Sequence, residues 1–265
     1  MTEGAVPADV PAVRSGPDPA PAAEGPARPA GARGGGPPVL LPGARTGREP
    51  ERSIRRGPRR VAPELVAATQ RERLLDGVAR TVAEQGFAGA RISDMCRTAG
   101  VTRPVFYEQF SGKEDAVLAA YRLGIALVVQ AMEYAYEEAG GAGDWPAAVT
   151  AGLGAVLELL AENPSFAAMV VEVEGVGAAG RAERERLLGR FRRFFADAPD
   201  TADRRPGELA PGRAELVDVL VGAVHAALYR KIARGEVEGL PDLLPTLVHV
   251  VLSPFGRAGA EPECP

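Results

Sequence analysis

The sequence predicts an all-α protein of about nine helices. Apolar residues recur at helical spacing from Leu65 onward, and Gly, Pro and Asn residues mark the expected helix ends. No segment of useful length alternates apolar and polar residues, so we expect no sheet. A composition of 46% hydrophobic and 25% charged residues is that of an ordinary globular protein.

The composition also separates an N-terminal tail from the rest of the chain. Residues 1–60 contain 12 Pro, 10 Gly and 10 Ala, and residues 1–44 show no apolar periodicity. We therefore expect residues 1–44 to be disordered. Residues 45–60 carry seven Arg and two Glu, which indicates either a solvated linker or a basic arm that follows phosphates. The expected divisions of the chain are 1–60 (tail and arm), 61–115 (helical head), 116–255 (helical body) and 256–265 (tail).

Several classes of protein do not fit this sequence. Its two cysteines, Cys96 and Cys264, can form neither a disulfide framework nor a four-ligand zinc site, and we expect Cys96 to be buried. We find no uncharged apolar run of about 18 residues and no secretory signal, so we expect a cytoplasmic protein without a membrane span. No phosphate loop, metal-spaced cluster or Ser/His/Asp grouping indicates an enzyme, so we expect no catalytic residue, metal or cofactor.

The head has the pattern of a helix-turn-helix. Its first helix is expected to end at Gly86 and its second at Gly100, where glycine accommodates a left-handed conformation. Thr102 is a good N-cap for a short third helix, in which Phe106 and Phe110 lie four residues apart and face inward. Arg103, Pro104 and Tyr107 are then expected on the outer face.

The body is expected to consist of six more helices. Two of them are apolar nearly all round and must be covered on every side. For 147–160, a central place in one subunit is sufficient, whereas for 216–228 a partner subunit is the simplest cover. The expected body helices span 113–139, 147–160, 165–174, 181–196, 214–233 and 243–252.

Residues 73–121 resemble the DNA-binding region of TetR-type transcriptional repressors. Residues 222–255 are similar to the dimer-forming end of many members of that family. The features that carry the first resemblance, in order, are Gly86-Phe87, Ile92, Asp94-Met95, Ala99-Gly100-Val101-Thr102, Phe106-Tyr107, Phe110 and Lys113-Glu114.

The resemblance implies a homodimer that binds a palindromic operator on double-stranded DNA and is released by a small-molecule effector. It implies that Thr102, Tyr107 and Lys113 contact phosphates, and that residues 103–105 face the major groove. Arg103 is the best candidate for a bidentate contact to guanine. The residues expected to contact DNA are Arg59, Arg60, Arg91, Thr102, Arg103, Pro104, Val105, Tyr107, Gln109 and Lys113.

The resemblance also implies an effector pocket and a dimer interface in the body. The pocket candidates are Met132, Tyr136, Phe166, Met169, Val170 and His225, although residues of these types at helical spacing are more often core residues. The interface candidates are Leu216, Leu220, Ala223, Ala227, Leu244, Leu247, Val248 and Val251. Two alternatives to a regulator stay open at this point: a helical interaction module that does not bind DNA, and a helical enzyme.

Overall fold

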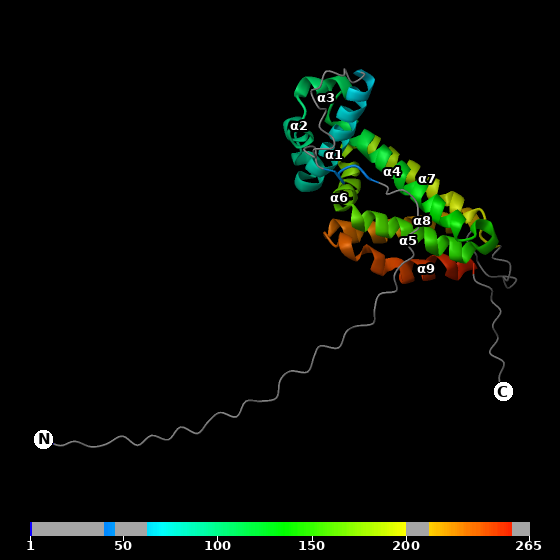
Figure 1. Ribbon diagram of the computed structural model, residues 1–265. Coiled ribbons are helices and arrows are strands. Elements are labelled where there is room, and N and C mark those ends of the chain that lie inside the picture. The colour runs from blue at the N-terminus through cyan, green and yellow to red at the C-terminus, as the bar shows by residue number, and fades with distance from the viewer. Residues whose placement is uncertain (2–39, 46–62, 200–211, 256–265) are drawn as a thin grey trace, which may run out of the picture. The chain divides into compact units, whose positions relative to one another are not determined.

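The computed structural model describes Met1 and residues 40–45, 63–199 and 212–255. All of these except Met1 belong to one compact unit, Pro37–Pro265. Over the described ranges the chain forms nine α-helices and no strand, which confirms the predicted all-α class (Figure 1). Their bounds are α1 Pro63–Gly89, α2 Ile92–Ala99, α3 Arg103–Gln109, α4 Lys113–Glu138, α5 Trp145–Glu162, α6 Pro164–Glu172, α7 Ala178–Phe191, α8 Arg213–Ala233 and α9 Leu244–Leu252.

The head consists of α1, α2 and α3, and its turns follow the predicted pattern only in part. Gly86 has φ 68° and ψ 164° and interrupts α1, but a further turn continues to Gly89, so the expected end at Gly86 is a break within the helix. Gly100 ends α2 in the left-handed conformation, with φ 67° and ψ 35°. Thr102 occupies the N-cap of α3 in an extended conformation, but its side chain makes no capping hydrogen bond.

The head is held together by a small apolar core. Leu74 and Val78 of α1 are fully buried together with Met95 of α2 and Phe106 of α3. Close approach of α1 and α2 requires Gly77, because a Cβ at this position would lie 2.8 Å from the Met95 carbonyl oxygen. The packing of α2 on α1 therefore depends on a missing side chain as well as on apolar contacts.

The body is built around α4 and α5, which pack against each other more extensively than any other pair of helices. The Asp144 side chain caps α5, since its Oδ1 accepts a hydrogen bond of 3.2 Å from the Ala147 N–H. The expected helix 181–196 instead begins at Ala178 and ends at Phe191, where a 3-10 turn, Arg192–Phe195, follows. This tighter turn brings Phe194 and Phe195 into the core.

Gly124 sets the distance between α4 and α6. A Cβ at Gly124 would overlap the ring of Phe166, which is fully buried. The Phe166 ring therefore packs directly on the backbone of α4. Since α6 also packs extensively on α1, α6 joins the body to the head.

Two segments are long and apolar enough to cross a membrane by length and composition alone: Lys113–Glu138 and Gly141–Glu162. In the most apolar 18-residue stretch of each segment, 56% of the first and 50% of the second is buried inside the protein. Such burial is that of core helices, which must be covered by their neighbours. The expected absence of a membrane span stays a prediction.

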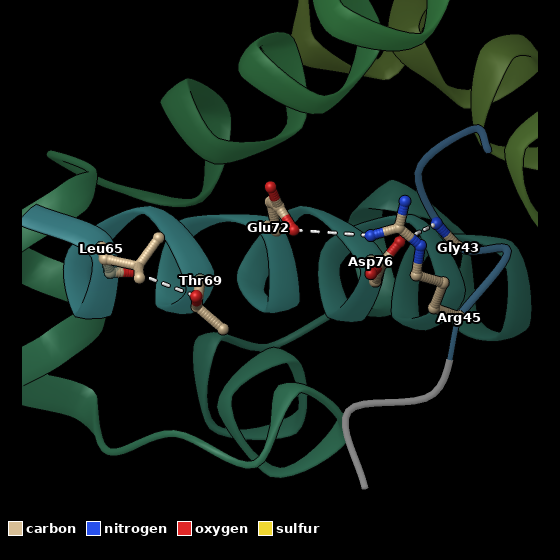
Figure 2. Close-up of polar contacts among 6 residues, drawn as sticks. All are labelled: Gly43, Arg45, Leu65, Thr69, Glu72 and Asp76. Atoms are coloured by element: carbon tan, nitrogen blue, oxygen red, sulfur yellow. Dashed lines mark hydrogen bonds and ion pairs between the residues drawn. The ribbon is translucent and has the colours of Figure 1, made fainter. Parts of the chain in front are cut away.

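Residues 40–45 correct the expectation that the chain is disordered up to residue 44. Leu41 is only 1% exposed, and the Gly43 N–H donates a hydrogen bond of 2.9 Å to Oδ1 of the buried Asp76 in α1 (Figure 2). A Cβ at Gly43 would also lie 3.0 Å from Cβ of Ser165 in α6. The segment thus packs on both α1 and α6. Burial of the single Leu41 side chain stabilises it, although the segment has no apolar periodicity from which this could be predicted.

Arg45 begins the predicted basic arm. Its guanidinium pairs with Glu72 of α1 at 3.4 Å, at the exposed edge of the buried segment (Figure 2). This arginine is therefore engaged by the protein itself. The other arginines of 45–60, including Arg59 and Arg60, lie outside the described residues, as do residues 1–39 apart from Met1 and the tail 256–265.

Candidate functional site

The outer face of α3 carries a group of exposed polar side chains. Thr102, Arg103, Pro104 and Tyr107 are all exposed, with Tyr107 at 58%. Beneath them the Phe106 ring is fully buried, and its edge meets the Tyr107 ring at a centroid distance of 5.5 Å. The inward and outward faces of α3 are thus those that the sequence predicts. An exposed arginine and tyrosine on a short rigid helix are suited to bases and phosphates in a DNA groove.

Three other predicted contact residues lie differently around this face. Arg91 is exposed directly before α2. Val105 is partly buried against the core, and Gln109 is half-buried while its carbonyl oxygen accepts a hydrogen bond of 3.4 Å from Arg71. Val105 and Gln109 therefore present less side chain to a groove than the sequence suggested.

Lys113 is engaged inside the protein. Its Nζ donates a hydrogen bond of 2.8 Å to the Phe87 carbonyl oxygen and lies 4.3 Å from the centroid of the Phe87 ring. The resemblance implies that Lys113 binds a DNA phosphate. To do so, the ammonium group would have to give up these two contacts. Lys113 instead ties the start of α4 to the end of α1.

Phe87 is held from the other side by α6. Glu172 Oε2 accepts a hydrogen bond of 2.8 Å from the Phe87 N–H. Both polar atoms of the Phe87 main chain are therefore bound by side chains, one from α4 and one from α6. Because φ of Gly86 is positive, the chain turns directly before Phe87 and exposes these atoms to Glu172 and Lys113. We call this arrangement of Phe87, Lys113 and Glu172 the Phe87 clamp.

The body encloses an apolar cavity of about 110 Å³. Its walls come from α4 to α9 and are apolar except for His225 and Tyr229 of α8. Burial, assisted by Arg184, lowers the pKa of His225, which therefore favours the neutral imidazole. Since a water molecule needs roughly 10–15 Å³ of such space and several polar partners, this cavity is suited to an apolar guest. The side chains that line it include Val128, Met132, Leu153, Val156, Val170 and Leu228.

The structure divides the six predicted pocket residues into two sets. Met132, Val170 and His225 line the cavity. Phe166 and Met169 are fully buried core residues outside it, and the Tyr136 hydroxyl donates a hydrogen bond of 2.9 Å to Asp197. Helical spacing identified apolar positions on the right helices, but only the packing of six helices decides which of them border an open space.

A second, polar space lies beside the cavity, between α4 and α7. We call this space of about 450 Å³ the arginine cleft; its charged side chains are Arg122, Glu183, Arg186 and Arg190. Glu183 is buried and Oε1 binds Arg122 at 2.6 Å as well as Arg186. Burial raises the pKa of Glu183, but the hydrogen bonds from both guanidinium groups outweigh this and hold the pKa below its usual range.

Sequence reasoning missed the arginine cleft. By their spacing, the arginines of α7 lie on the polar side of an amphipathic helix, and such a side is ordinarily solvated. A signal was present, because Glu183, Arg186 and Arg190 recur at intervals of three and four and therefore share one side of the helix. The partner on α4, Arg122, becomes visible only once α4 and α7 are packed together.

Several apolar residues are exposed on the outer sides of α8 and α9. On α8, Val219 is 66% exposed and is followed on the same face by the exposed Ala223 and Ala226; on α9, Val250 is 38% exposed. Of the eight predicted interface residues, only Ala223 is exposed in the single chain. Leu220, Leu247 and Val251 are core residues of this chain, and Leu216, Ala227, Leu244 and Val248 pack partly against that core.

Two predictions concern groups with special chemistry. Cys96 is buried, as expected, and burial raises the pKa of its thiol. Within the described ranges, no three His, Cys, Asp or Glu side chains are grouped so as to hold a metal ion.

Residues 74–120 match the model of a family described as bacterial regulatory proteins of the tetR family. The match covers α1 from Leu74, all of α2 and α3, and the first turns of α4. It therefore includes the exposed face of α3 and two members of the Phe87 clamp, Phe87 and Lys113, whereas Glu172 lies outside it. No protein of curated function matches the chain.

Several solved structures share the fold. One is the fatty acid degradation regulator FadR from Bacillus halodurans, with a TM-score of 0.60 and 14% identity over 76% of this chain and 100% of the other. Another is the transcriptional regulator FadR from Bacillus subtilis in complex with stearoyl-CoA, with a TM-score of 0.57 and 16% identity over 69% and 98% of the two chains. A third is a TetR family transcription regulator from Marinobacter aquaeolei, with a TM-score of 0.52 and 14% identity over 72% and 97%.

Proposed function

We propose that the chain is a transcriptional regulator of the TetR family, most simply a repressor, and the match of residues 74–120 to the model of that family supports this. In this proposal the head binds an operator, and a small molecule bound in the body releases it. The single observation that carries the proposal is the outer face of α3, which projects Arg103 and Tyr107 above a rigid aromatic core. Its place of action is then the cytoplasm, where the DNA lies.

The contacts that we propose to DNA follow from the geometry of α3. Arg103 extends two donors toward a guanine, while Thr102 and Tyr107 supply hydroxyl groups to phosphates on either side. Arg91, ahead of α2, is exposed and supplies a further charge for the backbone. Residues 61–115 carry seven basic and eight acidic side chains, so the head itself has almost no net charge. We therefore propose that the arginines of 45–60 supply additional positive charge for the DNA phosphates.

A dimer completes the proposed DNA-binding unit. Two copies must place their α3 helices about 34–36 Å apart to read a palindromic site. The exposed apolar residues of α8 and α9, which include Val219 and Val250, supply the surface that a second copy would cover. Because Leu220, Leu247 and Val251 face the interior, we propose Val219, Ala223, Ala226 and Val250 in their place as the interface.

The apolar cavity is the proposed site of the effector. Its lining excludes an isolated charge and favours a hydrocarbon chain or ring system. The regulator from Bacillus subtilis, which has the same fold, was solved with stearoyl-CoA, so this architecture can hold a fatty acyl ligand. We propose an apolar or partly apolar molecule as the effector of the present protein as well.

The Phe87 clamp is the proposed connection between the cavity and the head. Val170 and Val171 of α6 line the cavity, and Glu172 follows them directly and holds the Phe87 N–H. A ligand that displaces this part of α6 would therefore disturb the junction between the head and the body. Release from DNA then requires only that the ligand bind more tightly to the displaced arrangement.

The test is an electrophoretic mobility shift with DNA from the region that flanks the gene. We expect salt-sensitive binding to a palindromic site, which Arg103→Gln weakens about tenfold, because a good bidentate contact to a base contributes about 1–3 kcal/mol. Arg97→Gln is the matched control, since Arg97 is an exposed arginine of α2 that pairs with Asp94. Absence of salt-sensitive binding to any palindrome from that region would favour the alternative of an interaction module without DNA.

A further inference from the structure

We propose that the effector is an anionic amphiphile, whose apolar chain occupies the cavity and whose charged head is bound by Arg122, Arg186 and Arg190 in the arginine cleft. This inference rests on the proposed function and specifies the chemistry of its ligand. The chain and the head would be recognised by two different spaces that meet on one wall of the body.

The first argument is the position of the two spaces. Ile125 of α4 and Leu187 of α7 line both the apolar cavity and the arginine cleft. Both side chains are buried, with 7% and 6% exposed, so they form the boundary between the two spaces. A ligand that reaches past this pair would have one end among aliphatic side chains and the other among guanidinium groups.

The second argument is electrostatic. In the cleft, three arginines face one carboxylate, Glu183, which leaves two positive charges. The cavity has no such charge, since its only polar side chains are His225 and Tyr229. A carboxylate or phosphate would lose its hydration in the cavity without compensation, whereas in the cleft it would meet charge-assisted hydrogen bonds.

The third argument is preorganisation. The buried Glu183 holds Arg122 and Arg186 from two different helices, so their guanidinium planes are fixed before any ligand arrives. Each guanidinium has five N–H donors, and bonds to one carboxylate oxygen leave others for a second anion. Arg190 lies one helical turn beyond Arg186 and makes no ion pair with any residue that the structure describes. It is therefore the member of the cleft with the most donors to offer.

A head group in this cleft would also act on the junction with the head domain. Arg122 follows Lys113 by nine residues on the same helix, a distance of about 14 Å along the axis. Lys113 belongs to the Phe87 clamp. An anion that draws α4 and α7 together would thus displace the same helix that carries one side of the clamp.

The experiment is isothermal titration calorimetry of the full chain without DNA, with four probes: decanoate, decanoyl-CoA, 1-decanol and CoA alone. We expect decanoate or decanoyl-CoA to bind at least about tenfold more tightly than 1-decanol, since a charge-assisted hydrogen bond is lost in the alcohol. CoA alone is expected to bind weakly, because it lacks the chain. A preference between the two anionic probes identifies the head as a carboxylate or as a phosphate-bearing group, and either result supports the proposal.

Arg190→Gln is expected to weaken binding of the preferred anionic probe about tenfold and to leave that of 1-decanol unchanged. Arg181→Gln is the matched control, because Arg181 is an exposed arginine on the opposite side of α7. Arg186→Gln provides a second variant should Arg190→Gln fail to fold. Equal binding of 1-decanol and the anionic probes, or equal affinities of the Arg190→Gln and Arg181→Gln variants, would overturn the proposal.

These outcomes are separate from those that concern DNA. Ligand binding is measured here without an operator, so an anionic amphiphile that binds as expected supports the inference even where no palindrome is bound. Conversely, a chain that binds its operator but neither decanoate nor decanoyl-CoA keeps the proposed regulatory function and loses this ligand.

Discussion

The head and the body use their side chains in opposite ways. In the head, the aromatic residues Phe106 and Phe110 are buried, and the candidate functional residues Arg103 and Tyr107 lie on the outside. In the body, the candidate functional surface is an internal cavity, and its apolar lining belongs to the same helices that make up the core. A change in the head can therefore separate stability from binding, whereas a change in the cavity affects both.

This difference explains why the two regions differ in what a mutation can test. An outward residue on α3 such as Arg103 is exposed, so its loss should alter mainly DNA binding. A residue that lines the cavity also contacts its core neighbours, and its loss leaves a larger void. The Phe87 clamp lies between these cases, because it belongs to the junction of the head and the body and to neither surface.

The largest effect is expected from Phe106→Ala, which tests whether the core of the head supports the α3 face. Phe106 is fully buried and contacts both Tyr107 and Phe110 through its ring. Its loss should lower the free energy of unfolding by about 3–5 kcal/mol, measured by urea denaturation. Tyr107→Ala, one residue further and exposed, removes only the edge contact with Phe106 and should lower the free energy of unfolding by no more than about 1.5 kcal/mol. Similar losses in both variants would contradict the separation of faces.

An intermediate effect is expected from Glu172→Ala, which removes one side of the Phe87 clamp. The Phe87 N–H then loses its acceptor, and we expect a loss of about 1–3 kcal/mol in the free energy of unfolding. We also expect DNA binding to be retained and its release by an effector to be weakened, measured by a mobility shift with and without ligand. Glu172→Gln keeps an acceptor oxygen, so it should retain most of the stability and most of the release by an effector. Unaltered release in Glu172→Ala would show that the cavity and the head are connected elsewhere.

The smallest effect is expected from the pH dependence of the body. Burial lowers the pKa of His225 below its usual value of 6.5, so the folded chain takes up this proton less readily than the unfolded chain. The resulting stability is present above the usual pKa and is lost as the pH falls below it. When the pH is lowered from about 8 to about 5.5, the free energy of unfolding of His225→Gln should therefore fall less than that of the parent, measured by urea denaturation. Equal losses of stability in His225→Gln and in the parent over this range would contradict this role of His225.

The head could be predicted from the sequence because its signals are local. Gly100 and Thr102 mark the turn, and Phe106 and Phe110 orient α3, all within about three helical turns of chain. Capping of α5 by Asp144 is local in the same way, since Asp144 binds the N–H of Ala147 three residues further on. In each case, the residues that determine the conformation are neighbours along the chain.

The body could be predicted only as a set of helices. The same apolar periodicity that places Met132 and Val170 beside the cavity places Phe166 and Met169 in the solid core. Likewise, the interface residues predicted on α8 and α9 were the more apolar ones, and several of these fill the chain's own core. Periodicity reports that a side chain is buried, but it does not report what covers it.

The sequence by itself determined the helical class, the helix-turn-helix and the outward face of α3, because these depend on short-range spacing and on the conformations of glycine and proline. Only the tertiary structure decided the burial of Leu41, the Phe87 clamp, the cavity and the arginine cleft. Each of these joins residues that are far apart in the chain, such as Arg122 and Glu183. Which distant residues meet depends on how the helices pack, and close packing selects one arrangement among many that satisfy the same local pattern.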